Sequence, residues 1–91
     1  MTDLERAVAD SLRITEEAAN AILPTIQRNI GAAKAELVRA GCSDEQVEES
    51  GLLVEDAIIT FCMIRMGDES MRDKYQEAFE YQQDNLRKSK S

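Results

Sequence analysis

Hydrophobic residues recur at every third or fourth position along most of the chain, a spacing that predicts α-helices. The first helix is expected over about 3–11, because Thr2 and Glu5 stand three residues apart, as in a capping box. A turn should follow, and Thr15 can cap the next helical start. The N-terminus is therefore predicted to form one short helix that leads into a longer one.

The second apolar stripe runs through the middle of the chain, and Pro24 complicates its start. Proline inside a helix removes a backbone hydrogen bond and clashes with the preceding turn. The helix therefore either kinks at Pro24 or begins just before it, and a start at Ala21 or Leu23 places Pro24 in the first turn. Residues 16–20 would then form a separate turn or a loosely joined helical start, and Gly41 should end the main helix. The stripe consists of Ile22, Ile26, Ile30, Ala33 and Leu37.

The segment from Leu52 to Met66 is the most apolar of the chain, and it should lie at the centre of the fold. Its apolar residues cover more than half of a helical circumference, which is typical of a helix surrounded by others. Gly67 should end this helix, and Asp68 or Ser70 should cap a last helix over about 69–88. The two helices then form a hairpin. Its predicted core consists of Leu53, Ala57, Ile58, Phe61, Gly67, Tyr75, Phe79 and Leu86.

These elements predict an all-α protein, a small helical bundle of three main helices plus a short N-terminal helix. The 91 residues are enough for a single domain, 1–91, with a flexible tail at about 88–91. A further turn or one-turn helix is expected on the surface over 44–49, with Val47 as its apolar anchor. The single proline and the four aromatic residues favour helices over a β-sheet protein.

The net charge of −7 makes nucleic-acid binding by charge alone an unfavourable interpretation. The same net charge is compatible with a protein that surrounds DNA without binding it tightly. Cys42 and Cys62 cannot form a disulfide framework, and neither a signal peptide nor a membrane-spanning segment is expected. The composition therefore indicates a protein made and kept in a reducing cytosol.

The sequence offers little material for catalysis, so we expect no enzyme activity, no cofactor and no metal. It contains no histidine, which is the commonest general base and the commonest zinc ligand. The tripeptide Asp10-Ser11-Leu12 matches the modification site of acyl carrier proteins, which are also small, acidic and helical. Here it falls at the end of a predicted helix, whereas the carrier serine begins one, and an acyl-carrier-like protein is the least favoured alternative.

The last part of the chain, from about residue 52 to 89, resembles tailed-phage head–tail connector proteins, also called adaptor or head-completion proteins. In that family an apolar helix ends at a glycine, and an amphipathic helix with spaced aromatics follows. The matching residues are Val54-Glu55-Asp56-Ala57-Ile58-Ile59 and Phe61, the turn Gly67-Asp68, then Tyr75, Ala78, Phe79, Tyr81 and Leu86-Arg87-Lys88-Ser89. Residues 2–40 follow the family's order of short helix, capped turn and long helix.

The resemblance implies a structural subunit that forms a ring of about a dozen copies beneath the portal. Such a ring extends the DNA channel, joins the capsid to the tail and lets DNA pass without specific binding. The expected partners are further copies of the chain, the portal protein and a tail-side completion protein, with no membrane. The location would be the virion, assembled in the cytoplasm of a bacterial host or encoded by a prophage.

The alternative function is a small helical protein–protein interaction or regulatory module of phage or bacterial origin. Either function needs surface residues that contact a partner. Tyr81 falls off the inner stripe of the last helix, and a basic cluster ends the chain. The candidate subunit or partner contacts are therefore Tyr81, Arg87, Lys88 and Lys90.

Overall fold

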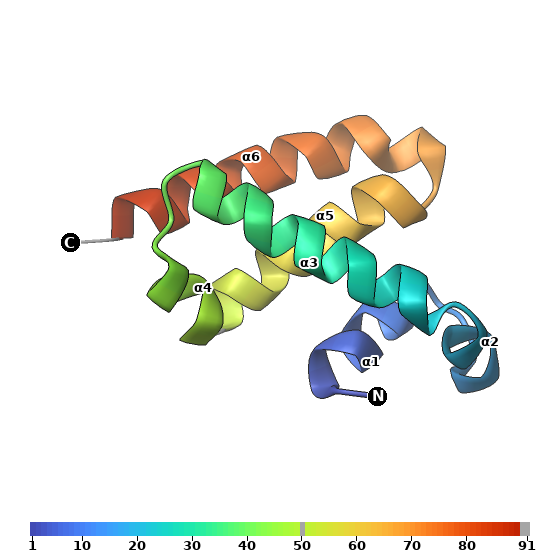
Figure 1. The fold of residues 1–91 in the computed structure, drawn as a ribbon. Coiled ribbons are helices and arrows are strands. Elements are labelled where there is room, and N and C mark those ends of the chain that lie inside the picture. Colours follow the sequence, from blue (N-terminus) through green and yellow to red (C-terminus); the bar gives the residue numbers. More distant parts are fainter. Residues whose placement is uncertain (50, 90–91) are drawn as a thin grey trace.

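Three long helices, α3 (Leu23–Arg39), α5 (Leu52–Met66) and α6 (Arg72–Ser89), build the frame of the protein (Figure 1). The computed structural model describes residues 1–49 and 51–89. Within these residues all regular structure is helical, which confirms the all-α bundle with three main helices and a short N-terminal one. The remaining elements are α1 (Asp3–Ser11), α2 (Glu16–Ala21), α4 (Asp44–Glu49) and the 3-10 turn η1 (Glu69–Met71).

The N-terminal helix begins where the capping box predicts. The Thr2 hydroxyl accepts a hydrogen bond from the Glu5 N–H at 3.1 Å, and the Glu5 carboxylate accepts one from the Thr2 N–H at 2.8 Å. Glu5 also accepts a hydrogen bond from the side chain of Gln27 in α3 at 3.1 Å. The cap therefore joins α1 to α3 in addition to starting the helix.

Pro24 marks the start of the second long helix. Helix α2 ends at Ala21, and α3 begins at Leu23 with Pro24 in its first turn, so the expectation of a late start is confirmed. The missing N–H of proline costs nothing there, because the first N–H groups of a helix have no partner within the helix. Thr15 caps the preceding α2 by accepting a hydrogen bond from the Ala18 N–H at 3.1 Å.

Helix α3 ends in a Schellman motif built on Gly41. The Gly41 N–H donates to the Val38 carbonyl at 3.1 Å, and the Cys42 N–H donates to the Leu37 carbonyl at 3.0 Å. Gly41 has a φ of 116°, a left-handed conformation that favours glycine. The predicted end of this helix at Gly41 is confirmed.

Helix α1 ends in the same motif without a glycine. The Arg13 N–H donates to the Asp10 carbonyl at 3.0 Å, and the Ile14 N–H donates to the Ala9 carbonyl at 3.3 Å. Arg13 occupies the left-handed position, with a φ of 59°. An arginine is unfavourable there, because its Cβ approaches the following carbonyl oxygen. The sequence pattern predicts a turn at this point, but it does not indicate that Arg13 adopts a left-handed conformation.

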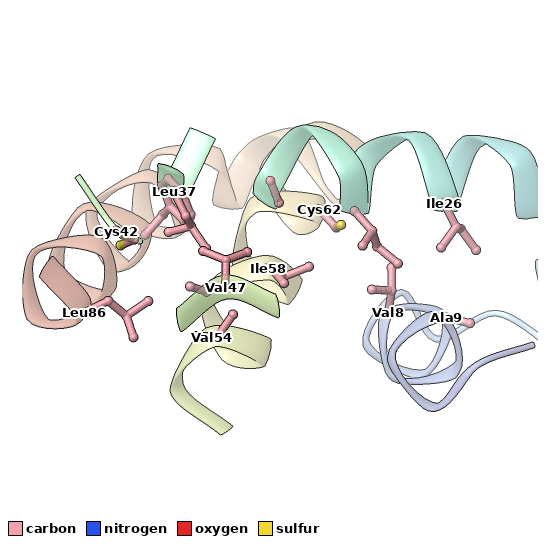
Figure 2. Close-up of a cluster of buried hydrophobic side chains, with 14 of the residues drawn as sticks. Val8, Ala9, Ile26, Leu37, Cys42, Val47, Val54, Ile58, Cys62 and Leu86 are labelled. Atoms are coloured by element: carbon pink, nitrogen blue, oxygen red, sulfur yellow. The ribbon is translucent and has the colours of Figure 1, made fainter. Parts of the chain in front are cut away.

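Helix α5 is the centre of the bundle, as its apolar character predicts. It packs against α6, α3 and α1, and α4 lies beside its beginning (Figure 1). Figure 2 shows the core between these helices, with Val8, Ala9 and Ile26 at one end and Leu37 and Leu86 at the other. The fully buried larger side chains are Ile26, Leu37, Ile58, Val8, Val47 and Cys62.

One residue of the predicted hairpin core is wrongly placed. Leu53 is exposed over 62% of its surface, and the neighbouring Val54 is buried in its stead. Because α5 is apolar on most sides, its sequence does not mark which side the other helices cover. In the first turn of α5 the neighbouring helices cover the side of Val54 and leave the side of Leu53 open.

The other predicted hairpin residues fall into two groups. Ala57, Ile58, Phe79 and Leu86 lie in the core. Phe61, Gly67 and Tyr75 are half-buried, and the ring of Phe61 meets Phe79 edge to face, with 5.4 Å between centroids.

The last helical segment begins at Glu69 with Asp68 as its cap, as predicted, but its first turn is a 3-10 turn. A 3-10 turn, η1, precedes α6, and the Asp68 carboxylate caps it by accepting a hydrogen bond from the Ser70 N–H at 3.0 Å. Helix α6 runs to Ser89, so the expected tail begins later than residue 88. Residues 90–91 of that tail lie outside the described residues.

Candidate interaction surface

Three large apolar side chains lie exposed together at the open end of the α5–α6 hairpin. Leu52 and Leu53, in the first turn of α5, are 80% and 62% exposed, and Tyr81, in the second half of α6, is 71% exposed. We call Leu52, Leu53 and Tyr81 the open-end patch. Single exposed leucines are ordinary on protein surfaces, but a group of large apolar residues is a feature of interaction sites.

A small hollow of about 140 Å³ adjoins the open-end patch. Leu53 of α5 and Tyr81 of α6 line it together with the buried Leu86, and Asp56 and Asn85 add polar groups. Both helices therefore contribute to one concave surface. The hollow is about large enough for one large apolar side chain. Interface anchors commonly fill pockets of this kind.

A second, wider hollow of about 450 Å³ continues the surface toward α4. Leu53 and Leu86 line it as well, so the two hollows share a wall. Leu52 and Glu49 lie on its other side, and Gln46 donates a hydrogen bond to the Leu86 carbonyl at 3.0 Å. That bond ties α4 to the last turns of α6 and gives the surface a third supporting helix.

The polar floor of the smaller hollow includes an unsatisfied group. The side-chain oxygen of Gln82 is buried and has no hydrogen-bond partner among residues 1–49 and 51–89. A buried amide oxygen without a partner is unfavourable, because it has lost its water and gained no donor. Gln82 itself is one of the residues that line the hollow.

The predicted basic contacts Arg87 and Lys88 form ion pairs within α6 and are not part of the open-end patch. Arg87 and Lys88 both form ion pairs with Asp84 of the same helix, and these pairs hold the pKa of the Asp84 carboxyl below its usual value. The single carboxylate of Asp84 thus balances one of these two positive charges within α6. Lys90 lies outside the described residues. Of the candidate contacts in the described part, only Tyr81 belongs to the open-end patch.

The opposite, closed end of the hairpin carries another hollow, of about 510 Å³. Tyr75 and Gly67 line it together with the turn at Arg13. Gly67 is needed at this place, because a Cβ there would lie 2.6 Å from the Met63 carbonyl oxygen. The methionines of this hollow are Met63, Met66 and Met71.

Three kinds of chemically active group can be located in the structure: a serine, a thiol and possible metal ligands. Ser11 is the last residue of α1, so the Asp-Ser-Leu tripeptide ends a helix where the carrier serine would begin one. Burial raises the pKa of the Cys62 thiol to about 11, which keeps it protonated and unreactive at neutral pH. In the part of the chain that the structure describes, no three His, Cys, Asp or Glu residues cluster as metal ligands would.

Comparisons of the chain with protein-family models, with curated proteins and with solved structures find no match. Among residues 1–49 and 51–89, no helix has both the length and the apolar character needed to cross a membrane.

Proposed function

We propose that this chain is a structural subunit of a phage head–tail connector, which docks under the portal, extends the DNA channel and joins the capsid to the tail. The proposal rests on the resemblance of residues 52–89 to that family. The observation that best supports it is the open-end patch, because Leu52, Leu53 and Tyr81 belong to this same segment and are exposed apolar residues. In a connector they would be covered by another protein of the assembly.

The position of the open-end patch suits a protein that acts by assembly. It lies on two long helices that pack along each other, so the bundle supports it on regular structure. A rigid surface loses little conformational freedom on binding, and such surfaces give stable contacts from a small area. Subunits of a ring also need contacts in which one face meets a different face of the next copy.

The test is to mix the purified chain with the portal protein of the same genome and to image the mixture by negative-stain electron microscopy. A connector should add a ring of density beneath the portal. A matched mixture with the Leu53→Ser/Tyr81→Ser variant shows whether docking uses the open-end patch. Portal particles without added density, at concentrations where the chain is folded and in excess, would refute the connector proposal.

A small helical interaction or regulatory module is the second candidate, and the same patch favours it. The two functions differ in what they assemble. A module binds one partner in a complex of fixed small size, whereas a connector forms a closed ring with the portal. The mass of the complex, measured by light scattering on the same mixture, separates them.

A further inference from the structure

The net charge of the protein is concentrated in the segment of the sequence that contains Leu52 and Leu53. Residues 44–56 contain six of the eighteen acidic residues and none of the eleven basic ones, so they carry −6 of the total charge of −7. The remaining residues are nearly balanced. The acidic residues of this segment are Asp44, Glu45, Glu48, Glu49, Glu55 and Asp56.

Two of these carboxylates, Asp56 and Glu49, border the patch, whereas Asp44 and Glu48 line a separate hollow with Lys34 and Arg39. Asp56 lines the small hollow beside Tyr81, and Glu49 lines the wider hollow beside Leu52. Within residues 1–49 and 51–89, none of the six acidic residues of this segment takes part in an ion pair. The surface is thus an apolar centre with an unbalanced acidic border.

From this arrangement we infer that the open-end patch binds a basic segment of a different protein. One large apolar side chain of that segment fills the hollow of about 140 Å³, and lysines or arginines beside it meet Asp56 and Glu49. Charge complementarity of this kind selects the partner and speeds its association. The inference deepens the proposed function by naming the chemistry of the partner, and it rests on that function only for the existence of a partner.

A second copy of the chain is a poorer occupant. A symmetric contact of two open-end patches would bring the acidic borders together, and like charges in an interface oppose binding. A contact with the basic end of α6 in a second copy offers little complementary charge, because Arg87 and Lys88 already pair with Asp84 of their own helix. Contacts between copies in a ring would therefore use other surfaces.

The inference is tested with a synthetic amphipathic helical peptide as the probe. The peptide carries leucines on one face and lysines beside each leucine, and a matched peptide has glutamate in place of every lysine. Titration of the full chain, followed by nuclear magnetic resonance of its backbone amides, should shift the signals of Leu53, Asp56, Tyr81 and Asn85 with the lysine peptide only. Binding should weaken by about tenfold or more between about 0.05 M and about 0.5 M salt.

Two variants with the same charge change serve as the pair for comparison. Asp56→Asn/Glu49→Gln should weaken binding of the lysine peptide at low salt, whereas Asp10→Asn/Asp73→Asn, which changes carboxylates away from the patch, should not. Equal binding of the two peptides would overturn the inference, as would shifts centred on the methionines of the closed end. Concentration-dependent shifts at the patch without any peptide would show that a second copy occupies it.

The connector function and the binding of a basic segment at the open-end patch can be refuted independently of each other. If the peptide binds as described but the portal mixture gives no ring, the connector function is refuted and the inferred chemistry of the patch stands. If rings form with the portal but the lysine peptide binds no better than the glutamate peptide, the connector function stands and the inference is refuted.

Discussion

Replacement of Arg13 by glycine should stabilise the protein, and this change tests how the structure ends its first helix. Arg13 holds the left-handed position of a Schellman motif, with a φ of 59°. Gly41 holds the equivalent position after α3, with a φ of 116°. The same motif therefore occurs twice in one small protein, once with the favoured residue and once with an unfavoured one.

The size of the effect follows from two opposing terms. A residue with a Cβ costs about 1–2 kcal/mol in a left-handed conformation. Glycine removes that cost but loses about 0.5–1 kcal/mol through its greater freedom in the unfolded chain. Arg13→Gly should therefore raise the free energy of unfolding by about 0.5–1 kcal/mol, which for a chain of this length corresponds to a rise of about 2–8 °C in Tm.

Thermal and urea unfolding, followed by circular dichroism, measure this change. Arg13→Ala is the matched control, because it removes the charge and keeps the Cβ, and it should not stabilise. Gly41→Ala should act in the opposite direction and cost about 1 kcal/mol or more, since its Cβ would also lie 3.1 Å from the Arg87 Cδ. The reasoning is refuted if Arg13→Gly is no more stable than Arg13→Ala.

The remaining predictions concern the core, pH and thiol reactivity. Ile58→Ala should lower the free energy of unfolding by about 2–5 kcal/mol, whereas Leu53→Ser should change it by less than about 0.5 kcal/mol; similar losses in urea unfolding would show that Leu53 is buried. The backbone N–H of Thr2 and then the side chain of Gln27 donate hydrogen bonds to the Glu5 carboxylate and lower its pKa. The ionised carboxylate therefore stabilises the fold at pH values above the ordinary pKa of glutamate. This stabilisation is lost as the pH falls through the lowered pKa that Glu5 has in the folded protein. The fall in Tm between pH 7 and about pH 3 should therefore be smaller in Glu5→Gln, and an equal fall in both proteins would contradict this. In a Cys42→Ala variant the remaining thiol, Cys62, should react with a thiol reagent far more slowly in native than in unfolded protein, since it is fully buried; equal rates would contradict the core packing.

Helix ends were the most predictable part of this fold, because they depend on residues that are close in sequence. Thr2 with Glu5, Pro24, Gly41 and Gly67 each act through one turn of backbone, and the structure begins or ends a helix at each. A hydroxyl that accepts a backbone N–H, or a residue without a Cβ, has its effect wherever the rest of the chain lies. Arg13 shows the limit, since arginine carries no sign that it will adopt a left-handed conformation.

The candidate site could be predicted only in part. The period of the last helix places Tyr81 away from the inner stripe, and the structure leaves it exposed at the open-end patch. The apolar pattern places Leu53 in the core and does not indicate its role in the same patch. The acidic residues of segment 44–56 do not mark Leu53 as exposed, because the same segment contains the buried Val47 and Val54.

The class of the fold, the order of its helices and the central place of α5 can be read from the sequence, since they depend on local propensity and on how apolar each segment is. Which side of α5 is covered depends on contacts between helices that are distant in the chain. A helix that is apolar on most sides can be rotated with little change in its own energy, and its orientation is set by the packing of α3, α6 and α1 against it. That packing buries Val54, exposes Leu53 beside Tyr81 and so creates the surface to which we assign a function.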